Sequence, residues 1–178
     1  MNLFARPKRR SAWFALGLLV CLAAPADLAV ADSFRKGAAA YERHDYMRAS
    51  AIFFDLAVAG DARAQTYLGY MYEYGKGVPQ NFVVSAGWYR CASQQGFASA
   101  QYFLGLMYDK GRGVPQDYVL AYALLNLAVA GAGRERDHWV IVRDAVNSKL
   151  SLAERSQAQQ LAFQGVPQQP CLPIVTGY

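Results

Sequence analysis

The stretch "MYEYGKGVPQ" at residues 71–80 returns as "MYDKGRGVPQ" at residues 107–116. Seven of the ten positions are identical, and two of the three exceptions keep the sign of their charge. The copies lie 36 residues apart in a chain of 178 residues. Self-similarity at such a period indicates stacked pairs of helices, in which each pair buries its apolar face against its neighbours.

The residues that precede each copy predict the first helix of a pair. In the first copy, four residues lie on one helical face, and the second copy repeats all four: Ala64, Leu68, Met71 and Tyr72. Gly69 and Gly105 fall in the middle of these helices, where glycine costs up to about 1 kcal/mol relative to alanine. Glycine at this place in both copies predicts that a neighbouring helix approaches closely.

The residues that follow predict a turn and a second helix. Gly75 and Gly111 can adopt the left-handed conformation that ends a helix, and the Val-Pro after each of them cannot continue it. Asn81 and Asp117 are residue types that begin helices well. Each copy therefore predicts two antiparallel helices joined by a glycine-rich loop.

The same pattern extends in both directions. Residues 37–60 predict another helix pair with a tighter turn, and residues 135–149 have helical periodicity. Ser151 and Glu154 match a capping box that opens a last helix to about residue 163. We therefore predict an all-α solenoid of about four helix pairs over residues 32–163, followed by an irregular tail at 164–178. The predicted units are 33–60, 61–96, 97–131 and 134–163.

Residues 1–31 have the features of a Sec-type signal peptide. A basic start at residues 8–10 precedes an uncharged apolar run at 12–24, and Ala29-Val30-Ala31 matches a cleavage motif. The run is short for a membrane span, although a retained anchor is the alternative. Cleavage after Ala31 predicts a protein that is periplasmic or secreted and is not stably inserted in a membrane.

Removal of the leader changes what the charge implies. The full chain has a formal net charge of +5, and the leader contains four basic residues and one acidic residue. The mature chain then has a net charge of about +2, which does not support binding to nucleic acid.

Two cysteines, Cys91 and Cys171, remain after cleavage. In an exported protein they could form one disulfide, but Cys91 could equally be a small buried residue on a helix. A Cys91–Cys171 bridge would pin the tail across the helix stack, where its apolar residues could occupy the binding surface.

The motif A-x3-LG-x-MY-x2-G-x-GVPQ-(N/D)-x4-A resembles Sel1-like repeats, and "GAAAYERHDYMRA" at residues 37–49 resembles a tetratricopeptide unit. The resemblance covers about 130 of the residues after the leader, and it is far more specific for fold than for function. It implies a non-enzymatic adaptor or regulator that binds a protein or peptide. A branch of this family with regular cysteine pairs is linked to β-lactam binding, but Cys91 stands alone within these repeats.

A solenoid of this kind leaves one helix-lined face for a partner. Helical spacing from Leu68 places ten residues on that face, and they differ between the copies while the apolar residues do not. Tyrosines among them are suited to anchoring a partner. The predicted partner-binding residues are Arg63, Thr66, Tyr70, Glu73, Tyr74, Ser99, Tyr102, Leu106, Asp109 and Lys110.

The sequence carries little that favours an enzyme. His44 and His138 have no partner at metal-ligand spacing, so neither a metal nor a cofactor is predicted. Residues 33–36 match S-x-x-K, but the other motifs of serine enzymes that bind penicillin are missing. The alternative function is a small-molecule binder or weak hydrolase that acts on β-lactam or peptidoglycan-like ligands.

Overall fold

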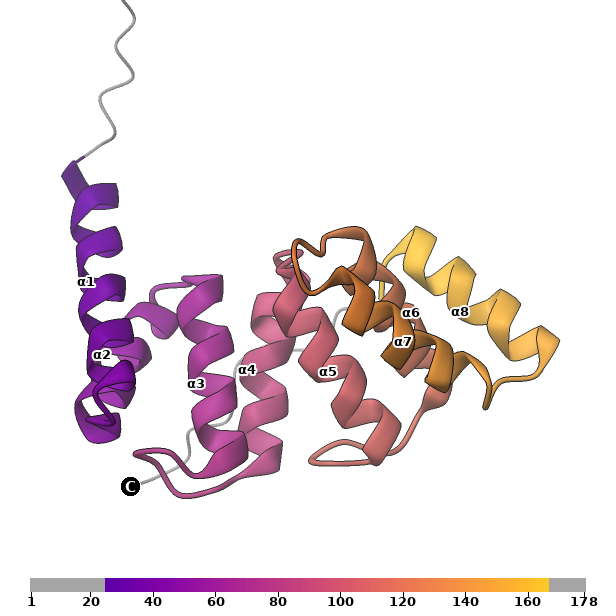
Figure 1. The fold of residues 1–178 in the computed structure, drawn as a ribbon, viewed down its shortest axis with the longest axis horizontal. Coiled ribbons are helices and arrows are strands. Elements are labelled where there is room, and N and C mark those ends of the chain that lie inside the picture. Colours follow the sequence, from indigo (N-terminus) through magenta and orange to yellow (C-terminus); the bar gives the residue numbers. More distant parts are fainter. Residues whose placement is uncertain (1–24, 167–178) are drawn as a thin grey trace, which may run out of the picture.

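The computed structural model of the protein describes residues 25–166, which form eight α-helices and no strand. Figure 1 shows the helices arranged in a row that runs from α1 at one end to α8 at the other, with α7 drawn across α6. Their bounds are α1 (Pro25–Glu42), α2 (Tyr46–Val58), α3 (Ala62–Tyr74), α4 (Phe82–Gln94), α5 (Ala98–Lys110), α6 (Tyr118–Ala130), α7 (Arg136–Asn147) and α8 (Leu152–Gln164). The predicted all-α solenoid is confirmed.

The helices pack in pairs, and each pair packs against the next. The first three pairs are α1 with α2, α3 with α4, and α5 with α6. Contacts of α2 with α3 and of α4 with α5 join them into a stack. The last two helices differ from the predicted fourth pair, because α7 and α8 both pack against α6 rather than mainly against each other.

The predicted helix ends of the two repeats are confirmed. Gly75 and Gly111 end α3 and α5 in the left-handed conformation, with φ of 66° and 65°. The Asn81 side chain accepts hydrogen bonds from the backbone N–H groups of Val83 and Val84 at the start of α4. At the start of α6, Asp117 accepts one from Leu120. Because these caps act locally, the helix ends follow from the sequence of each repeat.

The mid-helix glycines lie where a neighbouring helix approaches. A Cβ atom on Gly69 would lie 2.8 Å from the ring of Tyr89 on α4. A Cβ atom on Gly105 would lie 3.0 Å from Cγ of Leu125 on α6. The missing side chain thus allows the two helices of each repeat to pack closely, as predicted.

A second pair of glycines joins each repeat to the preceding unit. Gly77 has a φ of 72°, and a Cβ atom on it would lie 2.2 Å from the carbonyl oxygen of Tyr46 at the start of α2. Gly113 meets the carbonyl oxygen of Phe82 at the start of α4 in the same way. The glycine-rich loop of each repeat therefore rests on the beginning of the second helix of the unit before it.

The buried residues form two clusters that meet at α4. The N-terminal cluster includes Phe53, Leu68 and Met71, and it extends to Trp88 on α4. The C-terminal cluster begins with Ala86 and Tyr89 on the same helix and continues to α8. Since α4 contributes to both, it connects the two halves of the stack.

The predicted leader and tail lie largely outside the described residues. Helix α1 begins at Pro25 and continues through the predicted cleavage point after Ala31. Cys91 is buried on α4, whereas Cys171 lies outside the described residues, so the Cys91–Cys171 bridge stays a prediction. Within residues 25–166, no helix has the length and apolar character needed to cross a membrane.

Candidate protein-binding groove

A groove of about 430 Å³ lies between α1, α3 and the start of α5. Most of its lining residues are aromatic, and the rest are one arginine and two hydroxyl-bearing residues. We call this set the aromatic groove: Phe34, Tyr41, Arg63, Thr66, Tyr67, Tyr70, Phe97, Ser99 and Phe103. Because the first helices of three successive units contribute to it, stacking of the repeats forms the groove.

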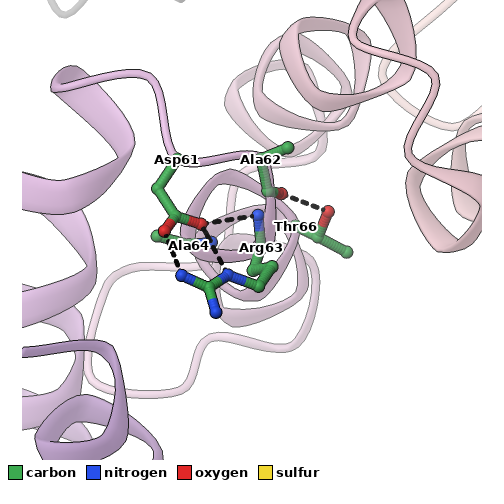
Figure 2. Close-up of polar contacts among 5 residues, drawn as sticks. All are labelled: Asp61, Ala62, Arg63, Ala64 and Thr66. Carbon is green, nitrogen blue, oxygen red and sulfur yellow. Dashed lines mark hydrogen bonds and ion pairs between the residues drawn. The ribbon is translucent and has the colours of Figure 1, made fainter. Parts of the chain in front are cut away.

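Asp61 and Arg63 order one end of the groove at the start of α3 (Figure 2). The Asp61 carboxylate accepts hydrogen bonds from the backbone N–H groups of Arg63 and Ala64, and it also binds the Arg63 guanidinium at 2.6 Å. The guanidinium carbon lies 4.3 Å from the ring centroid of Phe34. Burial raises the pKa of Asp61, but the hydrogen bonds from Arg63 and Ala64 outweigh it and hold that pKa below its ordinary value. The arginine is therefore fixed in place and largely neutralised.

Thr66 lies one turn further along α3. Its hydroxyl donates a hydrogen bond of 2.8 Å to the carbonyl oxygen of Ala62, as Figure 2 also shows. This bond satisfies the Thr66 hydroxyl within its own helix, so the methyl group is the part of the side chain that remains for contact with a ligand. Thr66 therefore contributes shape to the groove more than a hydrogen-bonding group.

A continuous row of rings crosses the first helices of the units. Within it, Tyr67 lies 5.7 Å from both Phe34 and Tyr41, measured between ring centroids. Tyr70 then lies 6.4 Å from Tyr41 and 6.1 Å from Phe103. These separations are typical of aromatic pairs that attract one another. The row holds the groove rings in fixed positions before any ligand arrives.

The row continues beyond the groove to α7. Phe103 lies 5.6 Å from Tyr102, which stacks on Trp139 with a centroid distance of 4.8 Å. The Tyr102 hydroxyl lies 3.2 Å from Nε2 of His138. These contacts join α7 to α5, the helix that also carries the groove residue Phe103.

Lys76, in the loop after α3, lies against the tyrosines at the other end of the groove. Its ammonium donates a hydrogen bond of 2.8 Å to the Tyr41 hydroxyl. The same ammonium lies 5.1 Å from the ring centroid of Tyr41 and 5.2 Å from those of Tyr46 and Tyr70. The hydrogen bond to Tyr41 raises the pKa of Lys76, so the side chain is positively charged at neutral pH.

Four of the predicted partner-binding residues line the groove, namely Arg63, Thr66, Tyr70 and Ser99. Tyr74 is exposed beside it, with its ring centroid 4.4 Å from that of Tyr70. These residues come from α3 and α5, as the sequence predicted.

The other five predicted residues lie elsewhere. Glu73, Tyr102 and Asp109 are buried within the stack, and Leu106 packs against the C-terminal cluster. Lys110 is exposed but pairs with Asp109 at 2.9 Å. The physical reason is that helical spacing fixes the angle of a side chain about its own helix, whereas the adjacent helices decide which angles are covered.

Five groove residues did not emerge from the repeat motif: Phe34, Tyr41, Tyr67, Phe97 and Phe103. The first two belong to the unit without the glycine-rich loop, so comparison of the two copies could not find them. A signal was nevertheless present, because aromatic residues recur along the first helices at positions 34, 41, 67, 70 and 103.

The histidines lie outside the groove lining. His44 lies in the turn between α1 and α2 with a φ of 64° and is exposed. Within residues 25–166, no three His, Cys, Asp or Glu side chains gather closely enough to hold a metal ion.

Comparison with known proteins agrees with the architecture. A family model described as the Sel1 repeat matches residues 62–97 and 98–132. No curated protein matches the chain. Among solved structures, a protective antigen present in uropathogenic Escherichia coli strains, described as displaying an SLR fold, aligns with a TM-score of 0.70 and 30% identity. The alignment covers 76% of this chain and 29% of the antigen.

A second solved structure is similar over a comparable part of this chain. It is a Sel1 repeat protein from Oxalobacter formigenes, with a TM-score of 0.57 and 28% identity. The alignment covers 72% of this chain and 54% of that protein. In both cases this chain spans well under two thirds of the similar protein.

Proposed function

We propose that this chain, whose two central units are Sel1 repeats, is a non-enzymatic adaptor that binds a peptide segment of a partner protein in the aromatic groove. Proteins with Sel1 repeats generally mediate protein–protein interaction, and the family is typically a non-enzymatic scaffold. Which partner this chain binds, and through which residues, is our proposal.

The observation that carries the proposal is the composition of the groove. Six of its nine lining residues are aromatic, and aromatic side chains are enriched where proteins bind one another. Five of the six rings contact another ring of the groove, so little side-chain freedom is lost when a peptide binds. Tyr67 and Tyr74 keep 36% and 52% of their surface exposed, which leaves them available to a ligand.

The proposed setting is the periplasm or the outside of the cell. This rests on the basic start, apolar run and cleavage motif of residues 1–31. The test is N-terminal sequencing of the protein recovered from the periplasm or medium of an expressing cell. An N-terminus at Asp32 is the expected result, and an intact Met1 in the cytoplasm would contradict it.

The binding proposal is tested with peptides selected from a random display library on the purified protein. Tyr67→Ala removes an exposed groove ring, and truncation of an anchoring aromatic typically costs 2 kcal/mol or more, about thirtyfold in affinity. Val83→Ala is the matched control, because Val83 is 68% exposed on α4 and does not line the groove. The affinities are measured by fluorescence anisotropy.

We expect Tyr67→Ala to weaken binding of the selected peptides and Val83→Ala to leave it unchanged. Circular dichroism checks that both variants keep their helix content. If Tyr67→Ala folds and binds as tightly as the wild type, the groove is not the binding site.

A further inference from the structure

The charges around the aromatic groove indicate which peptides it takes, provided that the proposed function is correct. None of the nine lining residues is acidic. Two cations in contact with groove rings, Arg63 and Lys76, lie at opposite ends of α3. Arg63 is in the first turn of this helix, and Lys76 is the second residue after its end. At about 1.5 Å of rise per residue they are separated by about 20 Å, the length of an extended peptide of roughly six residues.

The two cations differ in how far their charge is already neutralised. Arg63 forms an ion pair with Asp61 at 2.6 Å. In the described part of the chain, by contrast, no carboxylate lies within ion-pair distance of Lys76, whereas Lys36, Lys110 and Lys149 each have an acidic partner. The Lys76 charge is therefore the one that an incoming anion can neutralise.

Lys76 and Tyr41 together offer hydrogen-bond donors at the edge of the groove. An ammonium group has three donors, and within residues 25–166 Lys76 uses one of them, on the Tyr41 hydroxyl. Because that hydroxyl accepts the bond, its own proton is left to donate. Burial raises the pKa of Tyr41, which keeps this proton in place at neutral pH. Three tyrosine rings hold the ammonium in position, so an anion binds to a group that is already ordered.

We propose that the aromatic groove selects acidic peptides, with apolar or aromatic side chains on Tyr67 and Tyr70 and a carboxylate on Lys76 and Tyr41. The ligand is thus a short segment of a partner protein that combines Asp or Glu with aromatic residues. Basic segments are rejected, because Lys76 would face a like charge without a counter-ion.

The test uses the peptides that bind the wild-type protein, resynthesised with each Asp or Glu replaced by Asn or Gln. Lys76→Met removes the charge and keeps an unbranched side chain that packs against aromatic rings. Arg48→Met is the matched control, since it changes the net charge equally on α2, outside the groove lining. Lys76→Arg is the rescue variant, because it restores the positive charge.

We expect amidation to weaken binding to the wild type about tenfold and to have no further effect on Lys76→Met. Lys76→Arg and Arg48→Met should bind the acidic peptides within about twofold of the wild type. Higher salt should weaken the acidic peptides on the wild type more than on Lys76→Met.

The inference is overturned if acidic and amidated peptides bind the wild type equally, or if Arg48→Met loses as much affinity as Lys76→Met. It is also overturned if the peptides that bind the wild-type protein carry no Asp or Glu. These failures differ from failure of the proposed function, in which Tyr67→Ala would leave all peptide binding intact.

Discussion

Glu73 and Asp109 occupy the same position in the two repeats, yet their carboxylates have different partners. Glu73 accepts a hydrogen bond of 2.9 Å from the Tyr89 hydroxyl. The residue equivalent to Tyr89 in the second repeat is Leu125, which has no donor. Asp109 is bound instead by Lys149 from the turn before α8 and by Lys110. One repeat position therefore has two electrostatic environments, and their pH dependences have opposite signs.

The first prediction concerns Glu73→Gln. Burial raises the pKa of Glu73, and this outweighs the Tyr89 hydrogen bond and the Arg112 charge. A carboxyl group whose pKa is higher in the folded protein than in the unfolded chain destabilises the fold as pH rises. The loss begins near the pKa in the unfolded chain and is complete above the pKa in the folded protein. Glutamine does not ionise, so the variant should be more stable than the wild type at pH 7, where Glu73 bears the cost of burying a charged carboxylate.

This advantage should disappear in acid, where Glu73 is protonated and resembles the amide. Urea denaturation of both proteins across this pH range measures the difference in the free energy of unfolding. The raised pKa of Glu73 would be contradicted if Glu73→Gln were less stable than the wild type at neutral pH and equally stable in acid.

The second prediction concerns Asp109→Asn. Burial raises the pKa of Asp109, but the hydrogen bonds from Lys149 and Lys110 outweigh it and lower that pKa below its ordinary value. This stabilisation is fully present above the pKa that Asp109 has in the unfolded chain. It is lost as pH falls through the pKa of Asp109 in the folded protein. Asparagine should cost about 1.5–3 kcal/mol at pH 7, the range for hydrogen bonds to a charged group.

The two proteins should converge in stability below the folded pKa of Asp109. Both lysines are partly exposed, so added salt should also reduce the cost at neutral pH. The same denaturation series measures both effects. An equal cost at every pH would mean that packing around the side chain, rather than its charge, is responsible.

Helices α3 and α5 end in loops whose second glycine rests on the preceding unit, and this contact is the basis of the third prediction. Gly77→Ala should cost more than about 3 kcal/mol, because the strain of a positive φ, about 1–2 kcal/mol, adds to a clash with the Tyr46 backbone. Backbone atoms cannot move aside as a flexible side chain can. The midpoint of urea denaturation measures the loss.

Gly96→Ala is the matched control for this contact. Gly96 has a φ of 79°, similar to that of Gly77, but a Cβ atom there would have no neighbour within 4 Å. It should therefore show the strain alone, about 1–2 kcal/mol. Equal losses in the two variants would show that the loop does not depend on its contact with α2.

Elements that depend on local chemistry could be predicted from the sequence, and those that depend on contacts between units could not. The ends of α3 and α5 follow from Gly75, Gly111 and the capping residues, and the structure confirms them. The burial of Glu73 depends on Tyr89, which approaches because Gly69 has no side chain. The spacing of residues within one helix does not show which of its side chains a neighbouring helix will cover.

The same distinction applies to the groove and to the end of the stack. One wall of the groove belongs to α1, which is not followed by the repeated loop. Comparison of the two copies therefore could not identify Phe34 and Tyr41 as groove residues. The helices α7 and α8 lie within the predicted range, but their common packing against α6 follows from tertiary contacts of residues such as Trp139.

At the scale of the whole molecule, the two buried clusters that meet at α4 predict two regions of separate stability. Leu68 and Leu104 hold equivalent repeat positions and are almost fully buried, one in each cluster. Each Leu→Ala change should cost about 2–5 kcal/mol. Since each unit of a solenoid contacts mainly its neighbours, the damage should stay near the altered cluster.

Hydrogen exchange of the backbone amides measures this separation. Leu68→Ala should accelerate exchange mainly in α1, α2 and α3, and Leu104→Ala mainly in α5 to α8. Each variant serves as the control for the other. Equal acceleration across all helices in both variants would show that the stack unfolds as a single unit.

The position of Lys149 determines where a further repeat could be added to the stack. Its ammonium lies 4.8 Å from the ring centroid of Tyr118, at the place on α6 that corresponds to Tyr46 on α2 and Phe82 on α4. On those two helices, the glycine-rich loop of the following repeat occupies this place. An extra 36-residue repeat would therefore be inserted between Gly96 and Phe97, because the inserted second helix would offer its start to the next glycine-rich loop. A repeat added after α6 would find the start of that helix occupied by Lys149.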